Sequence, residues 1–171
     1  MIVNGKSLLG LAPIKNMEHL KQRSGDVTYG LGEAGYDIRI AEDVVFHKDT
    51  HHAFMTGVLV PGDPYGPVWS QGRFALASAI EEFDMPNCLV GVVHDKSSWA
   101  RKGLSVFNTV IEPGWRGFLT LELVYHGDTS IRIPAGSGIA QVIFHIITDP
   151  SFYEGRYQDQ PKGPVPAIPA R

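Results

Sequence analysis

A polar strip between residues 96 and 122 carries the side chains best suited to chemistry. It reads KSSWARKGLSVFNTVIEPGWRGFLTLE. Ser97, Ser98 and Arg101 can donate hydrogen bonds to a phosphate or to a developing anion. Glu122, in contrast, stands in an apolar stretch where a carboxylate is unexpected. The combination predicts a site for an anionic substrate that is transformed by acid/base chemistry.

The spacing within this strip favours one short helical turn. Arg101 follows Ser97 by four residues, so a helix over Ser97 to Arg101 would place both side chains on one side. The guanidinium fork suits a polyphosphate or a tetrahedral oxyanion. The simpler alternative is a polar helix start without a function.

Alternation between residues 117 and 126 predicts a strand with two different faces. One face is uniformly apolar and contains Leu119, Leu121, Leu123 and Tyr125. The other face is mixed and contains Phe118, Thr120, Glu122 and Val124. Glu122 is therefore expected to look into a cleft or a subunit contact, although a strand carboxylate that simply faces solvent would show the same pattern.

The rest of the chain predicts an all-β domain with little helix. Its 19 Gly and 12 Pro punctuate many short runs rich in strand-forming residues. The expected strands are Tyr36 to Ile40, Val44 to Phe46, Ala53 to Leu59, Phe74 to Ser78, Leu89 to His94, Leu104 to Asn108, Gly117 to His126, Ser130 to Ile133 and Ile139 to Ile147. A first helix is expected over Asn16 to Arg23, where Asn16 can act as the cap.

Composition limits the class of protein. The 171 residues fit one core, and residues 151–171, which are polar, aromatic and proline-rich, form a tail that is either disordered or laid over something. No apolar run approaches the roughly 20 residues of a membrane span, and no signal peptide is recognised, so a cytoplasmic location is expected. The net charge of -3 argues against a broad nucleic-acid-binding face. The single cysteine, Cys88, is expected to be a buried thiol without chemistry.

Several common kinds of site are not indicated. The chain has one Cys and no HxE paired with CxxC, so a zinc mechanism is not expected. His51 and His52 are adjacent but more consistent with a solvated loop than with a metal site. No GxxxxGK[ST], strand-linked GxGxxG or GxSxG motif is present, which argues against standard nucleotide cradles and acyl-transfer triads.

Five motifs in order resemble the superfamily of trimeric dCTP deaminases and dUTPases, and the match covers most of the chain. They are GYDIRI (35–40), KSSWARKGL (96–104), VIEPGWRGFLTLEL (110–123), IPAGSGIAQVIFH (133–145) and the tail segment GRYQDQPKGP (155–164). The resemblance implies a distorted β-barrel or jelly roll over residues 1–150. It also implies a homotrimer with its sites at subunit interfaces.

The resemblance also assigns roles. Glu122 takes the position of the deaminase acid/base, which pure dUTPases usually lack, and Ser97 and Arg101 orient it. Glu112 stands where the family usually has an Asp that reads the deoxyribose or, in dUTPases, activates water. The residues expected to bind the nucleotide are Lys96, Ser98, Glu112, Trp115, Gln141, Tyr153, Arg156, Tyr157 and Gln160. The tail is expected to act as a lid, and Mg²⁺ is expected to arrive with the triphosphate.

The implied reaction is hydrolysis of dCTP to dUTP and ammonia. Two departures leave other functions open: the segment between Arg101 and the Pro-Gly-aromatic turn is about two residues shorter than the deaminase pattern, and Glu112 replaces the Asp. The alternatives are a dUTP diphosphatase, a bifunctional enzyme that yields dUMP and pyrophosphate, action on a modified pyrimidine nucleotide, or a non-catalytic nucleotide-binding regulator.

Overall fold

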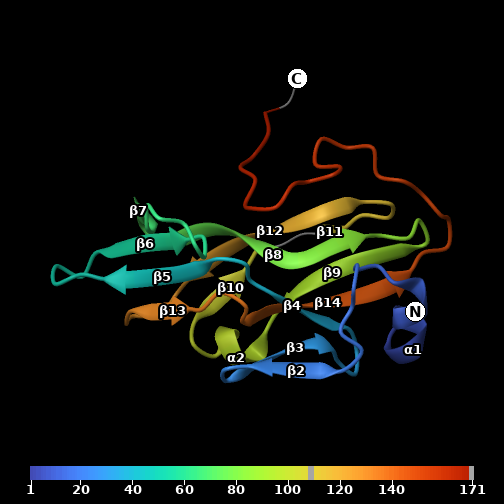
Figure 1. The fold of residues 1–171 in the computed structure, drawn as a ribbon, viewed down its shortest axis with the longest axis horizontal. Coiled ribbons are helices and arrows are strands. Elements are labelled where there is room, and N and C mark those ends of the chain that lie inside the picture. Colours follow the sequence, from blue (N-terminus) through green and yellow to red (C-terminus); the bar gives the residue numbers. More distant parts are fainter. Residues whose placement is uncertain (108–109, 170–171) are drawn as a thin grey trace.

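Three antiparallel sheets enclose one apolar core in a computed structural model that describes residues 1–107 and 110–169 (Figure 1). The largest sheet has the order β11-β9-β14-β4-β3-β2, with β1 paired to β14. Its strands are β1 (Ile2–Val3), β2 (Lys21–Ser24), β3 (Val27–Leu31), β4 (Tyr36–Arg39), β9 (Leu89–Asp95), β11 (Val110–Ile111) and β14 (Gly138–Ile146).

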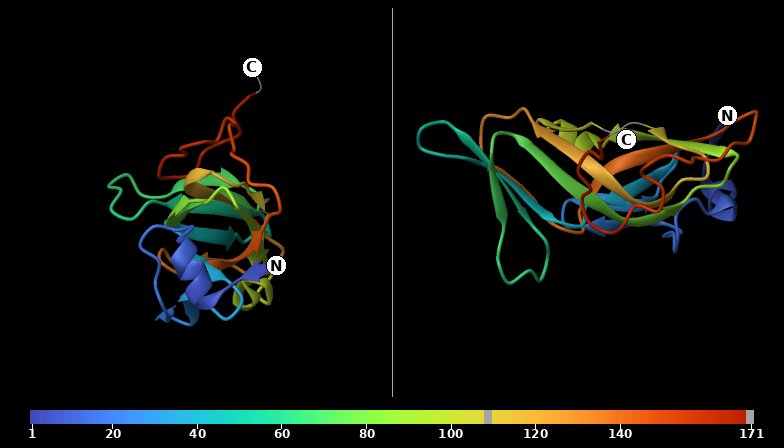
Figure 2. Two further views of the ribbon diagram at one scale, coloured as in Figure 1. Left: turned by 90° about the vertical axis from the view of Figure 1, so that its right-hand side faces the viewer. Right: turned by 90° about the horizontal axis from the view of Figure 1, so that it is seen from above.

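The two smaller sheets complete the barrel. One has the order β10-β12-β8, formed by β8 (Phe74–Asp84), β10 (Leu104–Val106) and β12 (Arg116–Tyr125). The other has the order β13-β5-β6-β7, formed by β5 (Asp43–Lys48), β6 (Phe54–Leu59), β7 (Val68–Gln71) and β13 (Ile131–Ile133). Seen end on, the sheets curve around the core and the tail lies outside them (Figure 2). The predicted all-β, distorted-barrel class is confirmed.

The apolar sides of the strands meet in the barrel interior. Leu121 and Leu123 of β12 are fully buried, as are Phe46 and Phe144 from the other two sheets. Phe46 stacks on Tyr125 with ring centroids 5.4 Å apart. The predicted apolar face of β12 is therefore the side that packs against the core and fixes which way Glu122 points.

The predicted helix over Asn16 to Arg23 is wrong. Asn16 has a left-handed φ of 53°, and Lys21–Ser24 forms β2, which pairs with β3 across a turn at Gly25. Asn tolerates the left-handed conformation better than most residues, so at this position it favours a turn instead of a helix cap. Residues with good helix propensity are thus drawn into an edge strand by pairing with β3.

The other short helix, α2 (Ser97–Ala100), lies where it was predicted. The sequence analysis missed α1 (Gly5–Leu11) and the strands β1, β2, β3, β7 and β11. The predicted strand from Leu104 ends at Val106, and its last expected residue, Asn108, lies outside the described residues. Within the described part of the chain, neither helix is long and apolar enough to cross a membrane.

The alternation along β12 is interrupted once. Its pairing with β8 shifts register between Phe118 and Thr120. Leu119, predicted on the purely apolar face, therefore also borders the pocket described below, together with Thr120 and Glu122. Glu122 thus lines a hollow on the side of β12 that the alternation predicted, and its prediction as a site residue stays a prediction.

The tail is laid along the outside of the barrel beside β12 (Figures 1 and 2). Gln160 forms a parallel bridge with Gly117, and the amide of Phe118 donates to the Gln160 carbonyl at 3.0 Å. Nearer the start of the tail, the Ser151 amide donates to the Asn87 carbonyl at 3.0 Å and the Tyr153 amide donates to the Pro113 carbonyl at 2.8 Å. The course of the tail is thus set by main-chain hydrogen bonds to the barrel.

Candidate active site

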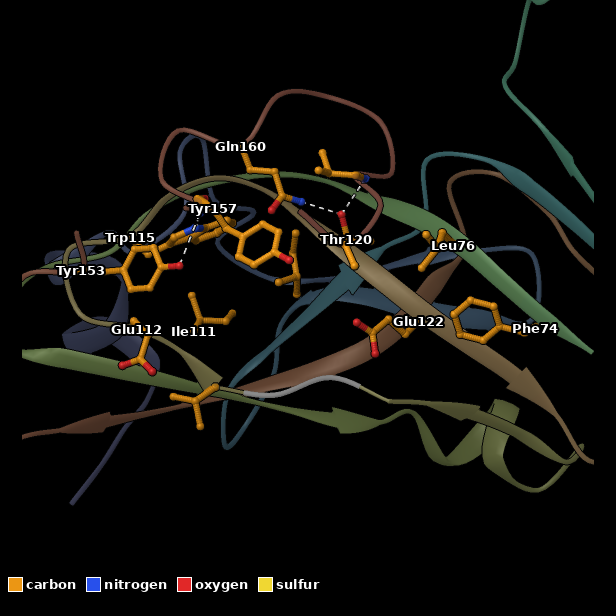
Figure 3. Close-up of a pocket in the computed structure, with 14 residues that line it drawn as sticks. Phe74, Leu76, Ile111, Glu112, Trp115, Thr120, Glu122, Tyr153, Tyr157 and Gln160 are labelled. Atoms are coloured by element: carbon orange, nitrogen blue, oxygen red, sulfur yellow. Dashed lines mark hydrogen bonds between the residues drawn. The ribbon is translucent and has the colours of Figure 1, made fainter. Parts of the chain in front are cut away.

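A pocket of about 570 Å³ lies between β11, β12, the start of β8 and the tail (Figure 3). Six predicted site residues line it: Glu112, Trp115, Glu122, Tyr153, Tyr157 and Gln160. The other lining residues are Phe74, Leu76, Val110, Ile111, Leu119, Thr120, Val165 and Ala167. The pocket thus joins aromatic and apolar walls to two carboxylates, a composition typical of sites for small organic ligands.

The two carboxylates come from different elements. Glu122 projects from the mixed face of β12, opposite Leu76 of β8, and is exposed. Glu112 follows β11 and is also exposed, and its carbonyl accepts the Trp115 amide at 3.2 Å in the Pro-Gly turn. Both side chains face the same hollow, in which Thr120 and Gln160 lie above Glu122 (Figure 3).

The described residues that line this pocket carry no positive charge. Two of them are Glu and none is Lys or Arg. Carboxylates alone repel an anionic ligand, because like charges at close range raise the free energy of the bound state. The pocket of a single chain is therefore suited to an uncharged ring or to a hydrogen-bond donor, and a phosphate group needs cations from elsewhere.

The α2 residues predicted to act with Glu122 lie outside the pocket. Ser97 and Arg101 are exposed, and the described residues offer the Arg101 guanidinium no ion pair or side-chain hydrogen bond. Trp99 fixes the helix to the barrel, because it is buried and its Nε1 donates to the Gly138 carbonyl at 2.8 Å. The chain thus presents Arg101 at the surface, outside the pocket that Glu122 lines.

Lys96 lies outside the pocket of its own chain. Its Nζ forms an ion pair with Asp37 Oδ2, and both side chains are largely buried, at 11% and 6% exposure. The pair joins the start of α2 to β4. Lys96 is thus engaged within the barrel. Ser98 lies beside it with a buried Oγ that has no hydrogen-bond partner among the described residues.

Two other predicted residues also lie outside the pocket. Gln141 stands in β14, opposite Asp37 of β4 and His94 of β9. Arg156 is exposed, and its Nη1 donates to the Ile168 carbonyl at 2.5 Å. The structure therefore divides the predicted site into a pocket set and a second set around α2, β14 and the turn of the tail.

The tail is held against the pocket by side chains of the Pro-Gly turn. Trp115 is buried against Phe83 and donates from Nε1 to the Tyr157 carbonyl at 2.6 Å. Gln158 receives the Arg116 amide at 2.9 Å and donates to the Gly114 carbonyl at 2.9 Å. Trp115, predicted as a substrate-binding residue, is thus also the anchor of the tail.

An exposed ion pair accompanies this anchor. Arg116 Nε donates to Asp159 Oδ1 at 2.8 Å, and this bond holds the pKa of Asp159 below its usual range. Both side chains are more than half exposed, so solvent screens the pair and its contribution to tail docking is small.

The pKa of Glu81, a buried carboxylate of β8, is shifted in the opposite direction, upward. Burial raises the pKa of Glu81, and two hydrogen bonds from Arg39, both 2.8 Å, offset part of that rise. The Arg39 guanidinium also lies over the Tyr29 ring at 4.5 Å. This pair lies outside the pocket and joins β4 to β8.

Sequence reasoning missed most of the apolar pocket wall and Thr120. Phe74, Leu76 and Val110 carry no chemical signal, and only their place beside Glu122 makes them part of the site. Thr120 had a usable signal, because the alternation put it on the same face as Glu122. Its hydroxyl accepts from Gln160 Nε2 at 2.5 Å and from the Val165 amide at 3.0 Å.

The described residues contain no group of three or more His, Cys, Asp or Glu that could hold a metal ion. Mg²⁺ usually binds through one or two carboxylates and the phosphates of its nucleotide. The residues present thus fit a Mg²⁺ ion carried by a triphosphate better than one held in a protein cage.

Known proteins resemble this chain in both sequence and fold. The family model described as dCTP deaminase-like matches residues 9–147. The dCTP deaminase of Roseiflexus castenholzii is 33% identical over 84% of this chain and 84% of its own length. The dCTP deaminase of Nautilia profundicola is 32% identical over 86% of this chain and 81% of its own length.

Solved structures agree on the fold. The dUTPase of Staphylococcus bacteriophage 80alpha covers 83% of this chain and 91% of its own, with a TM-score of 0.51 and 20% identity. Another structure of that enzyme, a point mutant with dUpNHpp, gives the same TM-score at 19% identity. These likenesses show a dUTPase-like fold, and the family match reaches from α1 through β14. The chain therefore belongs to the dCTP deaminase-like family.

Proposed function

We propose that this protein hydrolyses dCTP to dUTP and ammonia, with Glu122 as the acid/base. The observation that carries the proposal is the position of Glu122 in the pocket beside an aromatic and apolar wall that suits a pyrimidine ring. Membership of the dCTP deaminase-like family supports the same reaction.

The site is completed by a second copy of the chain. The pocket has two carboxylates and no lining cation among the described residues, whereas α2 presents an exposed Ser97 and an exposed, unpaired Arg101. A neighbouring copy that places its α2 at the pocket would supply the positive charge that a triphosphate requires. Apolar side chains at or near the pocket rim support such a contact, since Phe74, Phe107 and Val110 are 51%, 54% and 44% exposed. A closed homotrimer provides three such sites by symmetry.

The residues would share the work as follows. Glu122 takes a proton from water while the oxygen adds to C4 of the cytosine, and it delivers this proton to N3. Glu122 then takes the proton of the new C4 hydroxyl and passes it to the amino group, which leaves as ammonia while C4 becomes a carbonyl carbon. Arg101 and Ser97 of the second copy orient the carboxylate, and packing against that copy removes Glu122 from solvent. Mg²⁺, when present, neutralises phosphate charge.

The tail would hold the nucleotide against the barrel. Tyr153, Tyr157 and Gln160 already line the pocket, and Arg156 adds a positive charge nearby. Closing a site with such a segment excludes water and adds contacts. Removal of residues 151–171 is expected to weaken nucleotide binding while the barrel remains folded, and unchanged affinity would count against the lid.

Glu122→Gln tests the chemistry directly. The variant is expected to release no measurable ammonia from dCTP, because an amide cannot carry the proton, while the oligomeric state stays the same. Glu154→Gln makes the same chemical change at an exposed tail residue that does not line the pocket, and should retain wild-type turnover. Normal ammonia release by Glu122→Gln would remove Glu122 from the mechanism.

Glu112 favours one alternative, hydrolysis of dUTP to dUMP and pyrophosphate. Its carboxylate faces the same pocket, and the resemblance to dUTPases assigns it the position of their water-activating Asp. Incubation with dCTP and dUTP in the presence of Mg²⁺, followed by analysis of base and phosphate products, separates the cases. Ammonia with dUTP indicates deamination alone, pyrophosphate without ammonia indicates a dUTPase, and both products indicate a bifunctional enzyme. Binding without turnover indicates a regulator.

A further inference from the structure

Thr120 connects the catalytic strand to the outer part of the tail. Its Oγ1 accepts Gln160 Nε2 at 2.5 Å and the Val165 amide at 3.0 Å. Thr120 lies two residues before Glu122 on β12, and all four residues line the pocket (Figure 3). One hydroxyl thus ties two points of the tail to the strand that carries the proposed acid/base.

The two points enclose a short loop. Residues 161–164 read Pro-Lys-Gly-Pro, and Gly163 has a left-handed φ of 92°. Lys162 lies over the Phe118 ring at 5.5 Å and is exposed. At its first end the loop is held by the backbone of Gln160, and at its second end the Val165 amide donates to Thr120.

We propose that Thr120 is a positioning residue that latches residues 160–167 over the pocket. The inner part of the tail is held independently by Trp115, Arg116 and Gln158. Loss of the hydroxyl therefore frees the Gln160 side chain and the outer wall at Val165 and Ala167, while the Gln160 backbone stays bridged to Gly117 and the inner wall, with Tyr153 and Tyr157, stays docked. The effect on catalysis rests on the proposed function, whereas the latch itself does not.

Valine is the informative substitution because it keeps the shape and removes the acceptor. Gln160 is buried, at 9% exposure, so its amide would lose its partner in a place where water replaces it poorly. Serine keeps the hydroxyl and serves as the matched rescue variant.

The rate of tryptic cleavage in the tail tests the latch without any nucleotide. The bond after Lys162 lies in the latched loop, and the bond after Arg156 lies in the independently held part of the tail. In Thr120→Val, cleavage after Lys162 is expected to accelerate about tenfold, since two hydrogen bonds that oppose opening are lost. Cleavage after Arg156 should change less than about twofold, and Thr120→Ser should match the wild type. Intact-mass analysis of the fragments assigns each cut.

The catalytic consequence is a change in KM. In Thr120→Val the KM for dCTP is expected to rise about tenfold while kcat stays within about threefold, because the wall is lost and Glu122 is untouched. Equal cleavage after Lys162 in the wild type and Thr120→Val, or faster cleavage at both sites, would overturn the latch. An effect on kcat alone would also overturn it. If the wild type does not turn over dCTP, the proteolysis result still decides the latch while the proposed function fails.

Discussion

The backbone of Gln160 passes directly against Gly117. Gly117 has a φ of 131°, and a Cβ at this position would lie 2.5 Å from both the amide nitrogen and the carbonyl oxygen of Gln160. The close approach allows the parallel bridge between the tail and β12. Only a glycine combines this φ with this contact.

Gly117→Ala is therefore expected to displace the tail. Tryptic cleavage after Lys162 should accelerate, because the bridge that holds Gln160 against β12 is blocked, whereas cleavage after Arg156 should change less, because Trp115 and Gln158 still hold the inner part of the tail. Gly72→Ala provides the control, since Gly72 also has a positive φ, 108°, but a Cβ there would meet no atom within 4 Å. If both alanine variants were cleaved at the same rate, backbone strain and not the contact with Gln160 would explain the effect.

Removal of Lys96 alone is expected to destabilise the barrel strongly. Lys96→Met leaves the buried Asp37 carboxylate without its cation, which typically costs about 3–5 kcal/mol. Urea denaturation measures the loss. The double variant Lys96→Met/Asp37→Leu removes both charges and should recover part of the stability. A loss below about 1 kcal/mol in the single variant would show that the pair acts as a surface pair.

The proposed active site, shared between two copies of the chain, predicts complementation between inactive variants. Glu122→Gln and Arg101→Ala should each be inactive alone, because each lacks one half of every site. In randomly mixed oligomers, about a quarter of the sites combine an intact Glu122 from one copy with an intact Arg101 from another. Deamination measured after co-expression should therefore recover to about that fraction. No recovery, with mixed oligomers confirmed by mass, would place both groups of a site in one chain.

The buried Glu81 predicts a specific pH dependence of stability. Its pKa is raised above the ordinary 4.5, mainly by burial, so the folded protein holds this proton more tightly than the unfolded chain does. The stabilisation is complete below pH 4.5 and is lost as the pH rises through the raised pKa. Glu81→Gln cannot titrate at this position. The unfolding free energy of the wild type should therefore fall relative to that of the variant as the pH rises. A difference that stays constant between about pH 4 and 8 would contradict the assignment.

The sequence allowed prediction of the elements whose pattern is local. Alternation placed Glu122 on the open side of β12, and the Ser97 to Arg101 spacing located α2. The pocket also gathers Glu112, Trp115 and Glu122, which one polar strip had suggested.

Long-range contacts explain what was missed. The ion pair between Lys96 and Asp37 joins residues 59 positions apart, and no local sequence pattern indicates it. The course of the tail depends on Gly117 and Trp115 of the barrel, so composition alone left disorder and docking open. The register shift after Phe118 depends on β8 and altered the facing of Leu119.

The tail contributes Tyr153, Tyr157, Gln160, Val165 and Ala167 to a hollow whose floor is strand. The tail residues that line the pocket can therefore be exchanged while the barrel stays unchanged. Grafting this stretch from one relative onto another would retune ligand preference in a recipient barrel that keeps the glycine, the indole and the threonine hydroxyl that hold it.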